Sequence, residues 1–430
     1  MHMNGATGIP KANIRIDCNV TFQTMVDIGA NYCNASYTKS AVDEVGNFTL
    51  DNLKPRYVRV SIPVKHWEPE DRGDMGQIID WDRFNDSGVI NTLFGLLKDM
   101  KENRGVVNIT ASVWDVPNYM VSNPDDANKR VIKSSMYERV ARSVAAFMVR
   151  ARDGYGVSID YFSFNESNGG YQIYFTPQTC ISFIKAAAPI FEAYGLKTKF
   201  LVADTYDPST LVAFATPILE EGSIRKYLGP IAYHSWWSEG KPDSIFSDVA
   251  ALARKYDLPV WCNELGYDAM LYRSHDPNPY ETWDNAWRLA RITYRVLKFS
   301  EAVVTQYWTY QHNFPLVSRN LSPYPAYYVT KQLVDSLPAG MQLVEAVSDN
   351  EALWTLAAQG SDGRFMIQVM NSLEEPVEIA VDGIPPVRYN GIRTSKSENM
   401  TPLGTLEAKQ GRLSVELTPK SITTFAAIKQ

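Results

Sequence analysis

The sequence YFSFNES at residues 161–167 has strand character as far as Phe164 and then presents Glu166. A second stretch, WCNEL at residues 261–265, presents Glu264 in the same way. A parallel β/α barrel displays the residues at the C-terminal ends of its strands on one face, and its active site lies there. If both stretches are barrel strands, two acids from distant segments converge in one cleft.

The rest of the chain supplies further strands of such a barrel. From about residue 23 to residue 335, short apolar runs with strand character alternate with longer segments of helical period, as in a parallel α/β fold. Eight strands close this kind of barrel. The sequence predicts eight, at residues 24–28, 57–62, 106–112, 160–164, 200–203, 231–234, 259–262 and 303–307. We therefore predict a (β/α)8 TIM barrel.

Capping chemistry and periodicity predict several of the intervening helices. Ser135 with Glu138 predicts a capping box, and Thr176 before Pro177 places a proline at the first helical position. Apolar residues within 283–297 follow i, i+3, i+4, i+7 spacing, which predicts a helix with its buried face against the barrel.

The segment from residue 31 to residue 54 departs from this pattern. Polar and turn-forming residues dominate it, and no clear helical period follows the first strand. We therefore expect a hairpin or a long loop in place of the first barrel helix.

Beyond about residue 340 the pattern changes to closely spaced alternating strands separated by turn residues, which predicts a β-sandwich. These strands are expected at residues 353–356, 364–370, 377–381, 413–417 and 422–428. Residues 13–21 also have strand character, and we expect them to pair into the sandwich. The predicted domains are a catalytic barrel at 22–338 and a β-sandwich side domain made of 1–21 plus 339–430.

Composition points to two domains and a neutral ligand. The chain has 430 residues and 45% hydrophobic content, more than one small core usually holds. A net charge of -6 argues against a nucleic-acid partner, because phosphate binding favours clustered Lys and Arg. Aromatic residues make up 12% of the chain, including ten Trp and twenty-four Tyr, and sugar faces stack on such rings. A carbohydrate substrate is therefore expected.

The cysteines and histidines carry no metal or redox motif. Cys18, Cys33, Cys180 and Cys262 show no CxxC spacing and the five histidines are scattered, so we expect no metal and no organic cofactor. A bridge between Cys18 and Cys33 is an open alternative. No apolar run approaches the roughly 18 residues of a membrane span. The localisation is unknown from the sequence, and a secreted or periplasmic protein whose signal peptide has been removed is one alternative.

A pair of carboxyl groups is what hydrolysis of a glycosidic bond requires. In retaining enzymes the two lie about 5 to 5.5 Å apart; one attacks the anomeric carbon and the other protonates the leaving oxygen. Glu166 and Glu264 differ from the other acidic residues because each follows a strand and an Asn. We assign Glu166 as the acid/base, with the Asn165 amide beside it for the neighbouring sugar hydroxyl, and Glu264 as the nucleophile. A structural ion pair is the alternative for either acid, and an inverting pair, about 6.5 to 9.5 Å apart, stays open.

Two basic residues are expected near the acids. Arg59, on the second predicted strand, could keep Glu264 ionised through a charge-assisted hydrogen bond, or it could form a structural ion pair inside the barrel. His234, at the end of the sixth strand, could orient Glu264 or a substrate hydroxyl, or could be a structural group.

Tryptophans stand at several strand ends, where they could form a wall for sugar stacking or could belong to the core. These are Trp114, Trp236, Trp237 and Trp308, and the candidates in the loops are Tyr171, Tyr174, Tyr206, Tyr267, Tyr310 and His312. The predicted substrate-binding residues are Arg59, Trp114, Asn165, His234, Trp236, Trp308 and Tyr310.

With these residues the chain resembles the clan A glycoside hydrolases, and most of all glycoside hydrolase family 30, in which a (β/α)8 barrel is fused to a β-sandwich. The resemblance covers nearly the whole chain. In the barrel it rests on Phe164-Asn165-Glu166, Ala232-Tyr233-His234, Trp261-Cys262-Asn263-Glu264 and the run from Ser112 to Pro117. Further along the chain it rests on residues 337–341, 393–395, 398–400 and 417–425.

The resemblance implies roles position by position. Glu166 matches the family's acid/base, Glu264 its nucleophile and Asn165 the adjoining amide; Arg59, Trp114 and His234 match sugar-site positions. Two positions depart from the family's pattern. Ser167 stands where many relatives have Pro, and Trp236 stands where an aromatic hydroxyl is common. A hydrogen bond to the nucleophile is therefore either missing or supplied by another group.

The expected activity is that of a retaining β-glycosidase that works by double displacement. Members of the family act on xylan, β-1,6-glucans, galactans, glucosylceramide and small glucosides or fucosides, so the resemblance leaves the sugar and the linkage open. A barrel that has lost catalysis and only binds carbohydrate is the alternative from a different functional class.

Overall fold

The computed structural model describes residues 9–33 and 44–428, which fall into two compact units. One unit joins Asp27–His275 to Arg295–Ser322, and the other joins Met1–Val26, Asp276–Tyr294 and Pro323–Gln430. The predicted domain limits, 22–338 and 1–21 plus 339–430, stay a prediction. The units are defined by spatial contacts and divide the chain at different residues.

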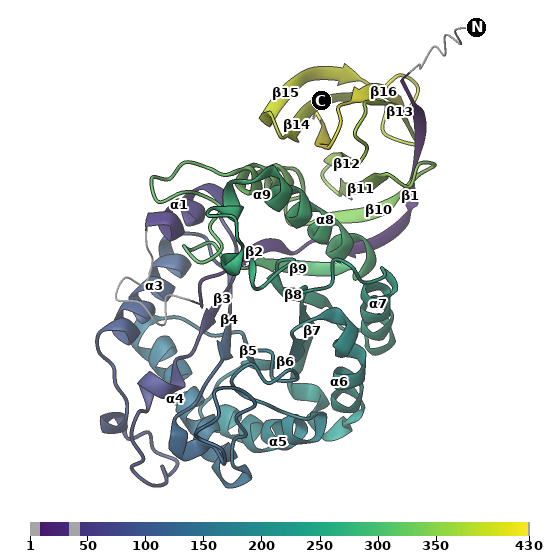
Figure 1. The fold of residues 1–430 in the computed structure, drawn as a ribbon. Coiled ribbons are helices and arrows are strands. Elements are labelled where there is room, and N and C mark those ends of the chain that lie inside the picture. Colours follow the sequence, from purple (N-terminus) through teal and green to yellow (C-terminus); the bar gives the residue numbers. More distant parts are fainter. Residues whose placement is uncertain (1–8, 34–43, 429–430) are drawn as a thin grey trace, which may run out of the picture. The chain divides into compact units, whose positions relative to one another are not determined.

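The first unit contains a closed barrel of eight parallel strands (Figure 1). All eight predicted strands are present. They are β2 (Asp27–Asn31), β3 (Tyr57–Ser61), β4 (Asn108–Val113), β5 (Tyr161–Phe164), β6 (Lys199–Thr205), β7 (Leu228–His234), β8 (Val260–Leu265) and β9 (Ala302–Tyr307). Strand β9 pairs with β2 in a register that places Val304 beside Asp27, and this pairing closes the ring. The predicted barrel fold is confirmed.

Helices follow the strands and lie outside the ring in Figure 1. They are α1 (Glu44–Leu53), the short α2 (Val64–Trp67), α3 (Val89–Asn103), α4 (Tyr137–Tyr155), α5 (Pro177–Ala193), α6 (Pro208–Glu220) and α7 (Ser244–Tyr256). Helix α8 (Trp283–Phe299) precedes β9, and α9 (Pro325–Ser336) belongs to the second unit. Within the described residues, no helix combines the length and the apolarity that crossing a bilayer requires.

The start of α5 was predicted correctly. Thr176 is its N-cap and accepts a hydrogen bond from the backbone N–H of Thr179 at 3.2 Å, and Pro177 is the first helical residue. The predicted capping box of Ser135 and Glu138 is wrong. Residues 134–136 already form a 3-10 turn, and α4 begins at Tyr137 without a side-chain cap.

The expected loop after the first strand is also wrong in part, because the helix α1 is present. Its buried side includes Val45, Leu50 and Leu53. Residues 34–43 of the same segment lie outside the described residues. The spacing of the three apolar residues gave no clear helical period, so packing within the folded protein decides the conformation here.

The second unit is built on a nine-stranded sheet that is mostly antiparallel. Its order is β15-β14-β17-β12-β11-β10-β1-β13-β16. The strands are β1 (Lys11–Thr24), β10 (Met341–Ser348), β11 (Leu353–Gly360), β12 (Phe365–Asn371), β13 (Val377–Asp382), β14 (Arg388–Ser395), β15 (Glu398–Glu407), β16 (Arg412–Leu417) and β17 (Ser421–Ala427). Tyr389 of β14 and Leu417 of β16 share one buried cluster, so the sheet curls around its core.

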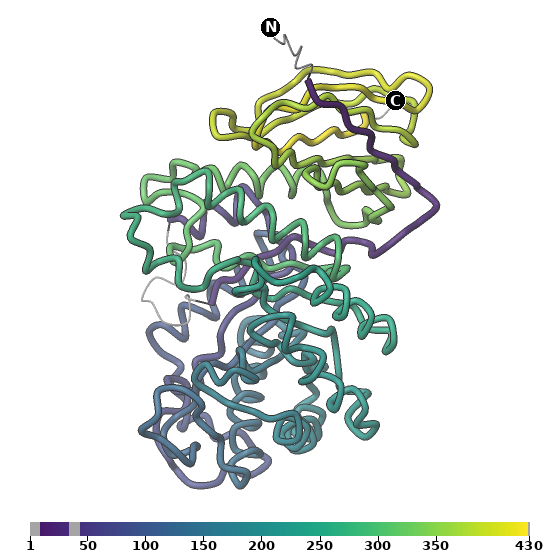
Figure 2. Tube along the Cα trace, turned by 45° about the vertical axis from the view of Figure 1, so that its right-hand side comes forward, coloured from purple at the N-terminus to yellow at the C-terminus, as the bar shows by residue number. Residues whose placement is uncertain are grey.

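Strand β1 joins the start of the chain to this C-terminal sheet. It pairs antiparallel with β10 and parallel with β13. Figure 2 shows it in purple among the green and yellow strands. Ala12, Ile14 and Ile16 alternate toward the core and are buried, as a half-covered strand requires.

Helix α8 differs from its predicted packing. Ala286 and Ala290 are buried, but the rings of Trp287 and Tyr294 lie 5.7 and 6.1 Å from the ring of Trp354 in β11. These two aromatic side chains therefore pack within the β-rich unit, whereas their spacing had predicted that they would pack against the barrel.

The four cysteines, Cys18, Cys33, Cys180 and Cys262, are all free thiols. The alternative of a Cys18–Cys33 bridge is therefore wrong.

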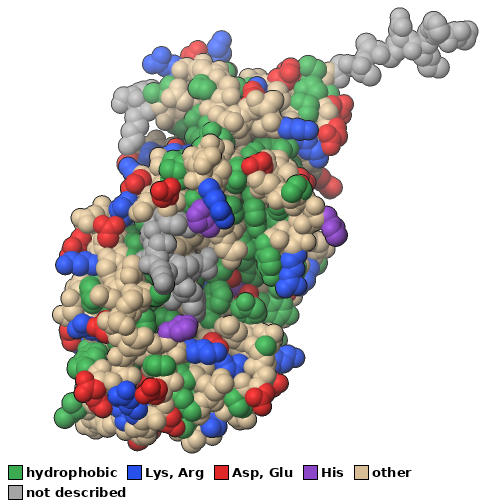
Figure 3. Space-filling view, turned by 60° about the vertical axis from the view of Figure 1, so that its left-hand side comes forward, with side chains coloured by type: hydrophobic (Ala, Val, Ile, Leu, Met, Phe, Trp, Pro, Cys, Tyr) green, Lys and Arg blue, Asp and Glu red, His purple; other side chains and the backbone are tan. Residues whose placement is uncertain are grey.

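The surface charges are mixed in sign. On the described part of the face drawn in Figure 3, acidic and basic side chains are interspersed, and Lys and Arg form no broad field.

Candidate active site

The structure brings Glu166 and Glu264 together, as predicted. Glu264 is the penultimate residue of β8, and Glu166 comes two residues after the end of β5. One carboxylate oxygen of each lies within 4.8 Å of the other. Both side chains are buried, and Glu166 has a φ of 45°, in the left-handed region that non-glycine residues seldom adopt. Such strained backbone is concentrated at functional sites.

Arg59 lies fully buried beneath the two acids. Its Nη1 donates to Glu264 Oε1 at 2.6 Å, and its Nη2 donates to Asn165 Oδ1 at 2.7 Å. Nη2 also lies 3.1 Å from Asp204 Oδ2. The guanidinium thus holds Glu264 through a charge-assisted bond and is at the same time part of a buried ion-pair network.

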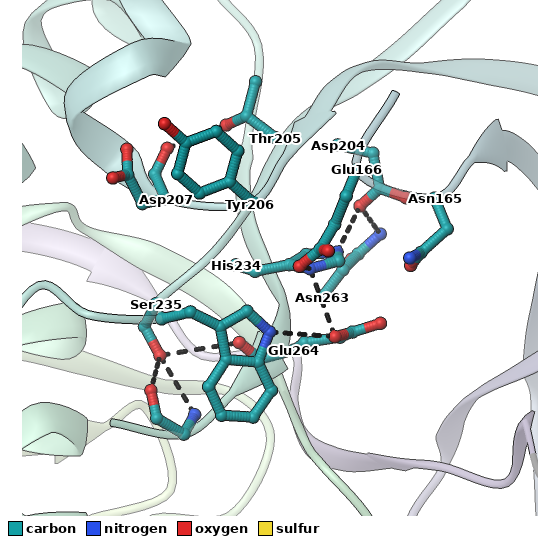
Figure 4. Close-up of polar contacts among 12 residues, drawn as sticks. Asn165, Glu166, Asp204, Thr205, Tyr206, Asp207, His234, Ser235, Asn263 and Glu264 are labelled. Carbon is teal, nitrogen blue, oxygen red and sulfur yellow. Dashed lines mark hydrogen bonds and ion pairs between the residues drawn. The ribbon is translucent and has the colours of Figure 1, made fainter. Parts of the chain in front are cut away.

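His234, the last residue of β7, is buried among three carboxylates (Figure 4). Its Nδ1 lies 2.9 Å from Glu166 Oε1 and 3.2 Å from Glu264 Oε2. Its Nε2 lies 3.1 Å from Asp204 Oδ1. The imidazole therefore contacts both candidate catalytic acids with one nitrogen and a third acid with the other.

The surroundings separate the pKa values of the two acids. Burial raises the pKa of Glu166 above its ordinary value, although His234 acts in the opposite direction. Burial alone would raise the pKa of Glu264 as well, but His234 and Arg59 outweigh it and bring that pKa below its ordinary value. One acid favours its protonated form and the other its ionised form, which is the difference that an acid and a nucleophile require.

Trp236 supplies the hydrogen bond that its sequence position had left in question. The indole Nε1 donates to Glu264 Oε2 at 3.0 Å, and the side chain is buried. An indole can only donate a hydrogen bond, whereas a phenol can also accept one. Gly266 makes room for this ring, because a Cβ at that position would lie 2.2 Å from Trp236 Cζ3.

Replacing Trp236 with Phe is expected to remove one donor from Glu264 while the ring is kept. A hydrogen bond to a charged group contributes about 1.5–3 kcal/mol, so kcat/KM should fall about 10- to 100-fold. The pKa of Glu264 should rise, which moves the acid limb of the kcat/KM profile to higher pH. The matched control is Trp261→Phe, which trims a buried indole of β8, the strand of Glu264, that packs on Tyr57 away from both acids. If the acid limb of the Trp236 variant is unchanged, the indole does not stabilise the ionised form of Glu264.

The aromatic residues of the predicted wall are placed differently from one another. Trp114 and Trp308 stack with ring centroids 5.2 Å apart, and Tyr171 meets Trp114 edge-on. Tyr310, in contrast, is fully buried beside Tyr32. Its role as a substrate-binding residue stays a prediction.

Asp204 was missed in the sequence. It lies near the end of β6 and is fully buried. Besides Arg59 and His234, it accepts hydrogen bonds from Ser163 Oγ at 2.6 Å and from Asn263 Nδ2 at 3.1 Å. Its place near the C-terminal end of a predicted barrel strand was the signal that could have found it.

A second aromatic pair at the rim of the barrel combines Trp237 of the predicted wall with Tyr206 of the predicted loop candidates. The rings of Tyr206 and Trp237 are 6.3 Å apart, and Trp237 is 47% exposed. Burial is the main cause that raises the pKa of Tyr206, and the charge of Glu166 contributes to the same shift. Tyr206 is therefore near enough to Glu166 to interact with it electrostatically.

Glu166, His234 and Glu264 also offer three ligand atoms within 4.8 Å of one another, a spacing that could hold a metal ion. A histidine must be neutral to bind a metal. Burial lowers the pKa of His234, but Glu264 and Asp204 raise it well above its ordinary value. Without an ion, the cluster therefore favours an imidazolium, which would have to lose a proton before it could bind a metal.

Comparisons with known proteins identify the fold. No protein-family profile matches the sequence, and no curated protein matches it. A GH30 endoxylanase from Clostridium papyrosolvens C71 is 18% identical, with a TM-score of 0.76, over 97% of this chain and 100% of that one. A glycoside hydrolase family 30 subfamily 8 xylanase from Clostridium acetobutylicum is 19% identical, with the same TM-score and coverage.

A conserved exported protein from Bacteroides fragilis is also similar, at 15% identity with a TM-score of 0.71 over 96% of this chain and 100% of that one. The chain therefore has the fold of the family 30 glycoside hydrolases, and the predicted structural resemblance is confirmed.

Proposed function

We propose that this chain, with the fold of the family 30 glycoside hydrolases, is a retaining β-glycoside hydrolase that acts by double displacement. The observation that carries the proposal is the pair Glu166 and Glu264. Their nearest oxygens lie within 4.8 Å, and their pKa values are shifted in opposite directions. An inverting pair needs a separation of about 6.5–9.5 Å to admit a water molecule.

In the first step Glu264 attacks the anomeric carbon while Glu166 gives its proton to the leaving oxygen. Arg59 and Trp236 hold the attacking carboxylate at 2.6 and 3.0 Å. Asn165 accepts from Arg59 through Oδ1, so its amide N–H group serves as the donor to the sugar hydroxyl beside the reacting carbon.

In the second step the now ionised Glu166 takes a proton from water, and the water oxygen attacks the anomeric carbon. The bond from that carbon to Glu264 breaks, which frees the carboxylate for the next cycle. Trp114, Trp308 and the rim aromatics Tyr206 and Trp237 are the proposed contacts for sugar faces.

The stereochemistry of the first product tests this mechanism. Proton NMR during hydrolysis should show the β-anomer first and the α-anomer only after mutarotation, because two inversions at one carbon restore its configuration. An α-anomer that appears first would overturn the assignment of Glu264 as the nucleophile.

The substrate to begin with is xylan, because two structures of this fold are described as xylanases. Aryl β-glycosides of glucose, xylose, galactose and fucose, together with β-glucans, complete the panel. Calorimetric binding without release of reducing sugar from any member would favour a carbohydrate-binding barrel that has lost catalysis. The intact pair of acids and their supporting donors disfavours that alternative.

Export from the cytoplasm is also proposed. A neighbour of the same fold is described as a conserved exported protein. Fractionation of the native host with an antibody to this chain would test the location.

A further inference from the structure

Asp204 reaches the catalytic pair only through other residues. Its side chain is fully buried, so it is shielded from a ligand in the cleft. Arg59, His234, Asn263 and Ser163 together give it four polar contacts, which matches the number of lone-pair sites on a carboxylate. Burial alone would raise its pKa, but Arg59 and His234 bring that pKa well below its ordinary value. Asp204 is therefore a fixed buried anion.

A neutral His234 would match only one of the two carboxyl groups that its Nδ1 contacts. A neutral imidazole carries one N–H group. If that group is Nε2–H, bonded to Asp204 at 3.1 Å, the lone pair of Nδ1 can accept the proton of Glu166 at 2.9 Å. The same lone pair then faces the ionised Glu264 at 3.2 Å with no hydrogen atom between them. An imidazolium has an N–H group on both nitrogens and removes this repulsion.

The balance of buried charge also favours the imidazolium form of His234. The ionisable groups around His234 are Asp204 from β6, Glu264 from β8, Glu166 after β5 and Arg59 from β3. Buried charges are stable when they are paired. With Glu166 protonated, the two anions Asp204 and Glu264 balance Arg59 only if His234 is also positive. The nearby thiols of Cys33 and Cys262 are neutral, because burial raises the pKa of Cys33 to about 12 and the pKa of Cys262 well above its ordinary value.

The same balance holds after the first chemical step. In the glycosyl-enzyme, Glu264 is an uncharged ester, and Glu166 has given its proton to the leaving group and become the anion. Nδ1 of His234 lies 2.9 Å from Glu166 and 3.2 Å from Glu264. One N–H group can therefore serve whichever carboxylate carries the charge while the ring stays in place, and His234 neither gains nor loses a proton in the cycle.

We propose that Asp204 is a positioning residue that fixes His234 as an imidazolium, whose Nδ1–H stabilises Glu264 before the covalent step and Glu166 after it. This inference rests on the proposed glycosidase function. Asp204 acts through His234, and the same ring interacts with both catalytic acids in turn.

The first test needs no substrate. NMR of the full chain with ¹⁵N-labelled histidine should show both ring nitrogens of His234 protonated from pH 5 to pH 9, and the His234→Gln spectrum identifies these signals among the five histidines. In Asp204→Asn the ring should lose one proton within this range. A wild-type His234 that titrates between pH 5 and pH 8 would overturn the proposal even if the variant did not fold.

The second test is kinetic, on any aryl glycoside that the wild type hydrolyses. Asp204→Asn should lower kcat/KM about 100-fold or more at pH 7, as loss of a buried stabilising group in an active site does. Ser163→Ala removes a neutral donor but keeps the anion, so its loss should be about 10-fold or less. Asp207→Asn is the control for a buried acid outside the cluster, because Asp207 pairs with Lys241 and caps α6. It should lower Tm and leave the signals of His234 unchanged.

The outcomes separate the two proposals. A wild type that hydrolyses no glycoside refutes the proposed function whatever the NMR spectrum shows. A wild type that is active, combined with an Asp204→Asn variant that keeps its rate and both ring protons, refutes the role of Asp204 alone.

Discussion

Glu264→Gln is expected to lower kcat by at least about 10,000-fold on every substrate that the wild type cleaves, because removal of a catalytic nucleophile has effects of this size. The amide has the shape of the carboxylate but is too weak a nucleophile to form the glycosyl ester. Its oxygen can still accept from Arg59, which donates to Glu264 at 2.6 Å, so the site should stay folded. The measurement is kcat on the most reactive aryl glycoside, together with a thermal unfolding curve.

The matched control for this variant is Glu68→Gln. Glu68 is fully buried and accepts from Arg139 Nε at 2.8 Å, so it is also a glutamate in a buried ion pair, but it lies outside the cluster of acids. Its replacement should lower Tm and keep most of the activity. Near-normal turnover by the Glu264 variant would show that Glu264 is not the nucleophile.

Glu166→Ala is expected to affect substrates according to their leaving group. Glycosides that need protonation should lose about 100- to 10,000-fold in kcat/KM, the usual contribution of general acid catalysis. A dinitrophenyl glycoside should keep most of its kcat/KM, because its leaving group departs without a proton. Its kcat and KM should fall together, since the glycosyl ester accumulates when no base activates water.

The pH profile provides a second readout for Glu166. The wild type needs this acid protonated, and burial raises its pKa, so kcat/KM should decline on the alkaline side as the proton is lost. That limb should be absent in Glu166→Ala. Equal losses on poor and good leaving groups, with the limb retained, would assign the acid role to another residue.

Local sequence information was sufficient for the barrel and for its two acids. Each strand of a parallel sheet is buried on both faces, so it leaves a short apolar run that can be recognised alone. Glu166 and Glu264 each follow such a run directly after an Asn, and that context separates them from the other acidic residues.

The surroundings of three other residues depend on contacts that no local pattern records. Asp204 is one acid among 48, and its role is set by donors from β3, β5, β7 and β8. The indole of Trp236 could be placed on Glu264 only after the neighbouring strands had been brought together. Tyr310 stands near a strand end like the others, and the full burial of its ring beside Tyr32 could not be read from that position.

The place of β1 has a consequence for biosynthesis. A ribosome releases Asn13 long before Asp349, the residue to which it bonds 336 positions later. Until then, the apolar face formed by Ala12, Ile14 and Ile16 is uncovered and the backbone of this segment is unpaired, a combination that promotes aggregation. The barrel segments can assemble during translation, whereas the sheet can close only after nearly the whole chain has emerged. We therefore expect the segment at residues 11–16 to be a site where chaperones bind the nascent chain.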